Sequence, residues 1–295
     1  MASVDRIENS LRAALARAKG PGCPPQLASA VRHAVFPGGA RIRPQLCLAV
    51  ARACGDDAPV LSDAAAAAIE LLHCASLVHD DLPCFDDAPV RRGQPSVHSA
   101  YGERLAVLAG DGLIVVAFQV LAHAAAQCPG HLPRLLGLLT TISASVGMPT
   151  GIVAGQAWEC EPRVSLREYQ REKTGSLFSA ATVAGAQAAG ADPQDWTALG
   201  ECLGEAYQVA DDIRDVVADP EQLGKPIGRD AALGRPSIAR ERGLAAAMRH
   251  FDALIGEATQ AVPQCQGAPM LRALVRSEAE RLVPVQMAAR LRAVA

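Results

Sequence analysis

The chain has 295 residues, of which 50% are apolar and only 3% aromatic, so it can bury a substantial core as one large domain or two small ones. Its formal net charge of -3 and the absence of a long basic block exclude an electrostatic nucleic-acid footprint. The nine cysteines are odd in number and form no CxxC pair, which argues against a disulfide framework and against a zinc site.

The first ten residues, MASVDRIENS, are charged from the start and lack the apolar stretch of a signal peptide. Ala and Leu dominate the apolar residues of the chain, and both favour helices, whereas strands favour β-branched and aromatic residues. Helical periodicity recurs between short Gly/Pro segments, without an internal repeat or a long linker. We therefore expect a soluble, cytoplasmic, all-α protein that folds as a single-domain helical bundle over residues 1–295.

The first long helix is predicted over 62–79, where a Ser-Asp pair provides a cap and apolar residues follow. This helix leads into LVHDDLPCFDD, whose acids are Asp80, Asp81, Asp86 and Asp87. Negative charge at the C-terminal end of a helix opposes the helix dipole unless cations or water screen it. Pro83 cannot continue an undisturbed helix, so a local break is expected to bring Asp80 and Asp86 together. Taken alone, the cluster is equally compatible with a solvated acidic turn.

The longest strongly apolar run, 113–122, is interrupted by Gln119 and is too short to span a bilayer.

A second long helix is predicted over 194–218 and contains QVADDIRDVVAD, whose acids are Asp211, Asp212, Asp215 and Asp219. Asp211 and Asp215 are four residues apart, so their carboxylates project from one helix face. A bound cation would offset their repulsion, and an exposed acidic face is the alternative.

The two Asp-rich sets together indicate a diphosphate site with several magnesium ions. Mg²⁺ prefers oxygen ligands and is usually held by a few carboxylates plus substrate phosphates. Its task at such a site is to neutralise a diphosphate so that it can depart as a leaving group. Mn²⁺ suits the same oxygen ligands.

At this point the sequence resembles the trans-isoprenyl diphosphate synthases over nearly its whole length. The segments that carry the resemblance occur in that family's order: PGGARIRP, ELLHCASLVHDDLPCFDDAPVRRG, LAGD, GQAWE, EKTGSLF, YQVADDIRD and LGKPIGRD. Several are most similar in wording to bacterial geranylgeranyl diphosphate synthases of carotenoid and bacteriochlorophyll pathways. The resemblance implies an all-α bundle around a deep central cavity, usually a homodimer.

The resemblance also implies roles for individual residues. Three carboxylates are expected to ligate three Mg²⁺ ions on the allylic diphosphate, namely Asp80, Asp86 and Asp211. Three more support that site through the ligands and water, namely Asp81, Asp212 and Asp215. Cations expected on the same diphosphate are Arg91, Lys173 and Lys225. Groups expected to bind isopentenyl diphosphate through charge-assisted hydrogen bonds are Arg41, His73 and Arg92. Thr174 and Gln208 are expected to face the reacting carbons and stabilise developing positive charge.

The implied reaction is ionisation, condensation and elimination, and it needs no side-chain nucleophile. The sequence departs from the family where many members have a Lys after the paired glycines and this chain has Ala40. Because Arg41, Arg43, His73 and Arg92 remain, we expect weaker isopentenyl diphosphate binding rather than none. A further departure is Arg235, where the family commonly has Lys; Arg keeps the charge but changes the donor geometry.

The length of the product is expected to depend on Ala75 and Ser76, five and four residues before Asp80. In fifteen-carbon synthases of the family a bulky aromatic residue commonly stands near Ala75. The small side chains here leave room for another isoprene unit, whose burial is favourable. Geranylgeranyl diphosphate is therefore the predicted product, and farnesyl diphosphate is the alternative.

Two other functions compete with this interpretation. A class I terpene cyclase shares the fold and the first acid motif, but its second metal motif normally mixes Asn or Asp with Ser or Thr and Glu. It also does not need an isopentenyl set. A non-catalytic partner subunit of another prenyl synthase is favoured only by Ala40, and such subunits usually lose the metal-binding acids that this chain retains.

Overall fold

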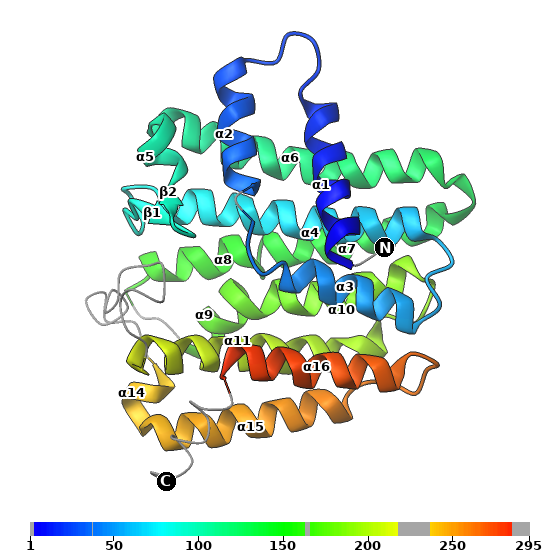
Figure 1. Ribbon diagram of the computed structural model, residues 1–295, viewed down its shortest axis with the longest axis vertical. Helices are drawn as coiled ribbons and strands as arrows, with labels where there is room; N and C mark the ends of the chain where they lie inside the picture. Colours follow the sequence, from blue (N-terminus) through cyan, green and yellow to red (C-terminus); the bar gives the residue numbers. More distant parts are fainter. Residues whose placement is uncertain (1–2, 37, 163–165, 218–236, 285–295) are drawn as a thin grey trace. The chain divides into compact units, whose positions relative to one another are not determined.

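The structure of the protein, a computed structural model, describes residues 3–36, 38–162, 166–217 and 237–284. These residues are helical almost throughout and include one short antiparallel hairpin, in which Val90 pairs with Pro95 and Arg91 with Gln94 (Figure 1). The predicted all-α fold class is confirmed.

The elements follow one another with short connections. In chain order they are α1 (Ser3–Ala18), α2 (Pro25–Val35), α3 (Ile42–Ala53), α4 (Pro59–Asp80), β1 (Val90–Arg91), β2 (Gln94–Pro95), α5 (Val97–Tyr101), α6 (Glu103–Gln127), α7 (Leu132–Val146), α8 (Ile152–Ala157), α9 (Leu166–Gln170), α10 (Ser176–Ala188), α11 (Thr197–Val217), α14 (Ile238–Arg242), α15 (Leu244–Gln260) and α16 (Ala268–Leu282). Single 3₁₀ turns lie at Pro129–His131, Trp158–Cys160 and Gln194–Trp196, and a π-helical turn at Arg171–Gly175.

Contacts divide the chain into two compact units. Unit 1 comprises Met1–Arg52, Asp56–Ser143 and Ala184–Ala191, and unit 2 comprises Ala53–Gly55, Ala144–Val183 and Asp192–Ala295. The first acid cluster lies in unit 1 and the described part of the second in unit 2. The expectation of one domain over residues 1–295 stays a prediction.

Helix α4 is the centre of unit 1, where it packs along α6 and also contacts α1 and α2 (Figure 1). Its middle is a run of alanines followed by Leu71 and Leu72, all buried, so neighbouring helices can approach it closely. Burying each large apolar side chain of this kind contributes about 1.5–3 kcal/mol. The helix therefore provides a rigid base for the acids at its end.

The predicted start of this helix is wrong by three residues. The helix begins at Pro59, which occupies the first turn, where its fixed φ is suited to helix and its missing N–H is not needed. Ser62 lies inside the helix, and its hydroxyl donates to a carboxylate oxygen of Asp56 at 2.6 Å. Arg6 of α1 pairs with Asp63 at 2.8 Å. The Ser-Asp pair thus connects α4 to its neighbours and does not cap it.

Helices α4 and α6 are long and apolar enough to cross a membrane by length and composition alone. In α4, 72% of the most apolar window is buried within the protein, as in the core helix of a soluble protein. The corresponding share in α6 is 44%, and its exposed residues include Leu108 and Val115. A larger part of the apolar surface is therefore exposed in α6 than in α4.

In unit 2, α11 packs against α15 and also contacts α14, α16 and the π-helical turn. The predicted helix over 194–218 is confirmed, with a 3₁₀ turn at Gln194–Trp196 before the α-helix and with Ala218 outside the described residues. Gly204 allows a close approach here, because a Cβ atom on it would lie 2.7 Å from the Cα of Gly175. The backbones of α11 and the π turn therefore touch directly.

A buried ion pair joins several elements of unit 1. The Arg41 guanidinium donates to Glu70 at 2.6 Å, to Glu8 at 2.9 Å and to the carbonyl of Val35 at 2.8 Å. The side chains of Arg41 and Glu70 are each only 2% exposed. Because three elements supply acceptors to one cation, the segment that carries Arg41 is fixed to α1, α2 and α4.

We expect Glu70→Ala to lower the free energy of unfolding by about 3–5 kcal/mol, because it leaves the Arg41 charge buried without its main partner. Urea denaturation measures this change. Arg12→Ala is the control, since its side chain is 58% exposed and its guanidinium lies 3.8 Å from Glu8. Such a pair contributes at most about 1 kcal/mol. Equal losses in the two variants would contradict the structural role of Arg41.

Candidate active site

The first acid cluster lies at the end of α4. The helix ends at Asp80, the chain turns back through Pro83, and the amide of Asp86 donates to the carbonyl of Asp80 at 2.9 Å. The predicted break at Pro83 is confirmed. It brings together the backbones of the two aspartates that the sequence analysis assigned to metal.

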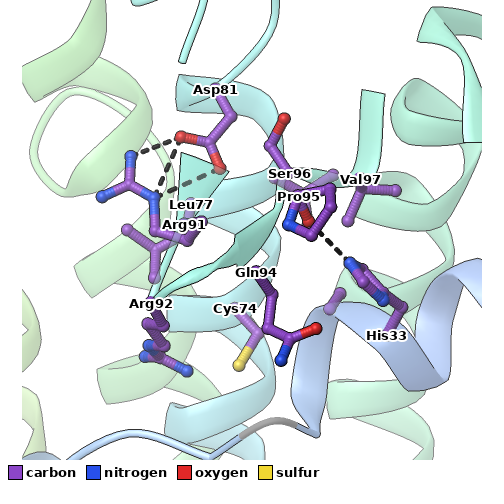
Figure 2. A pocket seen from close by; sticks show the side chains of 12 residues that line it. His33, Cys74, Leu77, Asp81, Arg91, Arg92, Gln94, Pro95, Ser96 and Val97 are labelled. Carbon is purple, nitrogen blue, oxygen red and sulfur yellow. Dashed lines mark hydrogen bonds and ion pairs between the residues drawn. The ribbon is translucent and has the colours of Figure 1, made fainter. Parts of the chain in front are cut away.

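Arg91 reaches the same turn from the β1–β2 hairpin (Figure 2). Its Nε donates to both carboxylate oxygens of Asp81, at 3.0 and 3.2 Å, and its terminal nitrogen also pairs with Asp81 and lies 3.9 Å from Asp80. Burial by itself would lower the pKa of Arg91, but the hydrogen bond and charge of Asp81 outweigh it and raise the pKa. Burial raises the pKa of Asp81, and Arg91 opposes this only in part. The turn therefore holds one cation among its acids.

A second cationic set of unit 1 consists of Arg43, His73 and Arg92. A terminal nitrogen of Arg43 lies 3.4 Å from Nε2 of His73. Burial lowers the pKa of His73 well below its usual value, and the charges of Arg43 and Arg92 lower it further. A neutral imidazole next to guanidinium groups is an environment suited to an anion.

Gly38 and Gly39 lie directly against Arg92. The guanidinium of Arg92 donates to the carbonyl of Gly38, and a Cβ atom on Gly39 would lie 2.6 Å from its central carbon. Gly39 also has φ +140°, which favours glycine. The paired glycines therefore let the chain pass directly against Arg92.

A small cavity of about 30 Å³ lies beside this set, between α2, α4 and the hairpin (Figure 2). Its lining includes His33, Cys74, Arg92 and Gln94. Nε2 of His33 lies 2.7 Å from the carbonyl of Pro95, which ties α2 to the hairpin. The cavity is large enough for water molecules but not for an isoprenoid tail.

Arg41 has partners that the sequence analysis did not expect. Its guanidinium, assigned there to isopentenyl diphosphate, is held by Glu8, Glu70 and the Val35 carbonyl. Arg43, two residues later, is the arginine of this segment that lies beside His73. From the sequence, Arg43 was expected only as one of the groups that remain for isopentenyl diphosphate where the family's Lys is missing. The partners of the two arginines in the fold distinguish them.

In unit 2, Lys173 and Thr174 lie in the π-helical turn, a kind of turn that is frequent at functional sites. The turn is anchored by Glu172, whose buried carboxylate accepts from the amide of Gly151 at 2.7 Å. The hydroxyl of Thr174 donates to Gln208 of α11 at 3.1 Å. The two residues assigned to the reacting carbons are therefore in direct contact.

Asp212 lies one turn after Gln208 on the same face of α11. It accepts from the side-chain amide of Gln208 at 3.1 Å and from the backbone amide of Ile238 at 2.9 Å. Burial raises the pKa of Asp212, although both hydrogen bonds favour its charged form. This carboxylate is thus occupied by protein donors on both oxygens.

Lys173 is held by a residue that the sequence analysis did not assign. Its ammonium lies 2.6 Å from a carboxylate oxygen of Glu159, which also accepts from the hydroxyl of Tyr169 at 2.6 Å. The ammonium lies 5.5 Å from the centre of the Tyr169 ring. Glu159 is the last residue of the GQAWE segment, so its motif was visible but its partner was not.

The remaining acids of the second cluster are only partly described. Asp211 pairs with Arg214, three residues later, at 2.9 Å. Asp215 lies on the same helix. Asp219, Lys225 and Arg235, named in the sequence analysis, lie outside the described residues.

Ala75 and Ser76 lie in the last two turns of α4. Ala75 is buried, and the hydroxyl of Ser76 donates to the carbonyl of His73 at 2.8 Å. Because a helix repeats every 3.6 residues, Ser76 lies one turn below Asp80 on the same side, whereas Ala75 is turned away from both. Of the two, Ser76 is the one directly in line with the acid turn.

The donors fit magnesium that arrives with a phosphate ligand. Within the described ranges, no three or more His, Cys, Asp or Glu side chains are arranged to hold a metal ion by themselves. Mg²⁺ is usually bound by one or two carboxylates together with substrate phosphate oxygens and water. A turn with Asp80 and Asp86 provides carboxylate oxygens of that kind.

Comparison with known proteins gives a consistent assignment. Residues 24–268 match the polyprenyl synthetase family. The geranylgeranyl diphosphate synthase of Cereibacter sphaeroides is 55% identical over 290 residues, which cover 98% of this chain and all of that protein. The farnesyl diphosphate synthase of Geobacillus stearothermophilus is 38% identical and covers 82% of each chain. Among solved structures, an FPP/GFPP synthase from Zymomonas mobilis has a TM-score of 0.79 at 27% identity, covering 94% of this chain and 97% of that one.

The lowered pKa of His73 predicts a pH dependence of stability. Unfolded histidine titrates near about pH 6.5. Below that value the unfolded chain binds a proton that the folded protein does not, so the free energy of unfolding falls as the pH falls. His73→Gln should flatten this slope by up to about 1.4 kcal/mol per pH unit.

Denaturation at a series of pH values from neutral to mildly acidic measures this slope. His250→Gln is the matched control, since His250 lies on the surface of α15 and pairs with Glu205. Parallel slopes for the wild type and His73→Gln would contradict the prediction.

Proposed function

The chain belongs to the polyprenyl synthetase family, and we propose that it is a magnesium-dependent trans-prenyltransferase whose product is geranylgeranyl diphosphate. The observation that carries this proposal is the arrangement within unit 1, where an acid turn and a cationic set lie at one end of α4. Such an arrangement suits a metal-bound diphosphate next to a second anionic substrate. The 55% identity to a geranylgeranyl diphosphate synthase supports the product.

The carboxylates Asp80, Asp86 and Asp211 would hold Mg²⁺, with three ions in all, as the family resemblance implies. When bound, the metal neutralises the allylic diphosphate and makes it a better leaving group. Asp81 holds Arg91 in the acid turn, so that the cation is available to the same diphosphate. Asp215 keeps its supporting role at the metal site, and Lys225 its role as a cation that binds the allylic diphosphate, as the resemblance implies.

Lys173 is proposed to bind the allylic diphosphate by exchanging one anion for another. Its ammonium is paired with Glu159 and lies against Tyr169. A diphosphate carries more negative charge than a carboxylate, so it can compete for the same ammonium. Glu159 then serves to hold the lysine in place until the substrate binds.

Isopentenyl diphosphate is proposed to bind at Arg43, His73 and Arg92. This assignment replaces Arg41 with Arg43, because the charge of Arg41 is balanced by Glu8 and Glu70. Arg41 instead fixes the segment from which Arg43 projects. Direct hydrogen bonds from guanidinium to phosphate oxygens are strong and directional.

The chemistry then follows from positioning and charge. The allylic C–O bond breaks, the double bond of isopentenyl diphosphate attacks the resulting cation, and a proton is lost to the departed diphosphate. Thr174 and Gln208 present polar oxygen atoms that stabilise the positive charge as it develops. The protein supplies orientation and preorganised electrostatics, with no covalent intermediate.

The first experiment incubates the purified chain with Mg²⁺, isopentenyl diphosphate and each of dimethylallyl, geranyl and farnesyl diphosphate. The dephosphorylated products are identified by mass spectrometry. A dominant linear twenty-carbon alcohol is expected. A fifteen-carbon alcohol would identify a farnesyl diphosphate synthase, and cyclic products made without isopentenyl diphosphate would identify a cyclase. Activity only with a second polypeptide would identify a partner subunit.

Arg43→Leu should raise the KM for isopentenyl diphosphate by about 10- to 100-fold, the range expected for losing a hydrogen bond to a charged group. The KM for the allylic diphosphate should change much less. Ala40→Lys should lower the KM for isopentenyl diphosphate, since it adds a cation at an exposed position beside the same segment. If Arg43→Leu raised both KM values equally, the assignment of Arg43 would fail.

Bulky residues at the end of α4 should shorten the product. Ala75→Phe is expected to shift the main product to fifteen carbons, as the family resemblance implies. Ser76→Phe should have at least as large an effect, because Ser76 lies one turn below Asp80 on the same side. Product mass distributions measure both effects. Unchanged chain length in both variants would exclude this part of α4 as the limit on length.

We further propose that the enzyme is a cytoplasmic homodimer that supplies pigment synthesis. The exposed apolar residues of α6, Leu108 at 52% and Val115 at 55%, support a second copy as the partner of this helix. Val115→Glu should convert a dimer to a monomer in light scattering. Val153→Glu, at an equally exposed position on α8, is the control and should leave the mass unchanged.

A further inference from the structure

A continuous chain of hydrogen bonds runs through unit 2 from the π turn to α14. The hydroxyl of Thr174 donates to Oε1 of Gln208, and Nε2 of Gln208 donates to Asp212. The other oxygen of Asp212 accepts from the backbone amide of Ile238, the first residue of α14. Every member of this chain is provided by unit 2 alone.

The direction of this chain is set at its Asp212 end. A backbone N–H can only donate, and an ionised carboxylate can only accept. The part of Gln208 that faces Asp212 must therefore be its NH₂ group, and its carbonyl oxygen must face Thr174. Since Asp212 is 6% exposed, water has little access to replace these bonds.

We infer that Asp212 is the positioning residue that fixes the amide orientation of Gln208, so that Gln208 presents its carbonyl oxygen beside Thr174. This inference rests on the proposed function for its consequence, because it is the carbonyl oxygen that stabilises a developing positive charge. It assigns to Asp212 a task different from support of the metal ligands. The task is carried out through hydrogen bonds on α11 and α14.

Asp212→Asn is expected to reverse the direction of the hydrogen bonds between positions 174, 208 and 212. The oxygen of the new side chain must face the Ile238 amide, which leaves its NH₂ group facing Gln208. Gln208 must then turn its oxygen toward position 212 and its NH₂ group toward Thr174. A donor with partial positive charge replaces the carbonyl oxygen beside the reacting carbons.

The test combines Asp212→Asn with Gln208→Glu. The double variant restores the original direction of the hydrogen bonds and moves the carboxylate by one helical turn, from position 212 to position 208. Asp212→Asn should lower kcat by about 10- to 100-fold, the loss expected for one hydrogen bond to a charged group. Gln208→Glu should also lower kcat, because it sets two carboxylates against each other. In the double variant, Glu at 208 accepts from Thr174 and from Asn at 212, so kcat should return to within about threefold of the wild type.

Two further measurements separate this role from metal support. The Mg²⁺ concentration for half-maximal activity should be unchanged in Asp212→Asn. Loss of a residue that supports the metal would raise that concentration. Glu205→Gln is the control that removes another acid from α11, since Glu205 is exposed and pairs with His250. It should change neither kcat nor the Mg²⁺ concentration for half-maximal activity. A raised Mg²⁺ requirement together with no recovery in the double variant would overturn the inference.

The same four proteins can be compared without substrate or metal. In EDTA, urea denaturation of the wild type, the two single variants and the double variant gives the coupling between positions 208 and 212. The unfolding equilibrium constant should show a coupling of about tenfold or more, in favour of the matched pairs. Additive effects would overturn the inference even if the proposed prenyltransferase activity is found. A clear coupling would support it even if that activity is absent.

Discussion

The buried Arg41 guanidinium is the interaction on which the arrangement of unit 1 depends. Burial of a charge is costly unless the charge is paired and hydrogen-bonded. Here Glu8 of α1, Glu70 of α4 and the carbonyl at the end of α2 together meet that requirement. The backbone at Arg41 has φ +49°, a conformation that a non-glycine residue adopts only where its surroundings impose it. The segment after the paired glycines is therefore held rigidly, and Arg43 is brought beside His73.

An acid turn and the set of Arg43, His73 and Arg92 occupy successive positions along one end of α4. Asp80, Asp81 and Asp86 lie at the terminus, with Arg91 among them. His73 lies about two turns earlier, next to Arg43. A metal-bound anion is favoured at the first position and a bare anion at the second. Under the proposed function, the spacing between His73 and Asp80 would set the distance between the two substrates along the helix.

Features that depend on local sequence were predictable, and features that depend on distant partners were not. Ala and Leu content was enough for the helical class, and Pro83 was enough for the break after Asp80, because both act through the backbone. The start of α4 was misplaced because Ser62 and Asp63 resemble a cap in sequence, whereas Asp56 and Arg6 engage them in the fold. Arg41 and Arg43 are alike in sequence and differ only in what surrounds them. Glu159 stood in a recognisable segment, but its contact with Lys173 depends on how the π turn folds back.

The contact between Gly204 and Gly175 has a consequence for how this sequence can change over time. Because the separation of α11 from the π turn is set by backbone atoms, the apolar residues around it can vary without altering the distance from Thr174 to Gln208. Gly204 itself has no such freedom, since a methyl group added there would meet the backbone of the π turn, whereas a Cβ atom on Gly175 would meet nothing closer than 3.9 Å. Substitution is thus tolerated in much of the packing around Thr174 and Gln208 but not at Gly204. A lineage that lost Gly204 would be expected to regain the contact between Thr174 and Gln208 only by reversion or by a compensating shift of the whole turn.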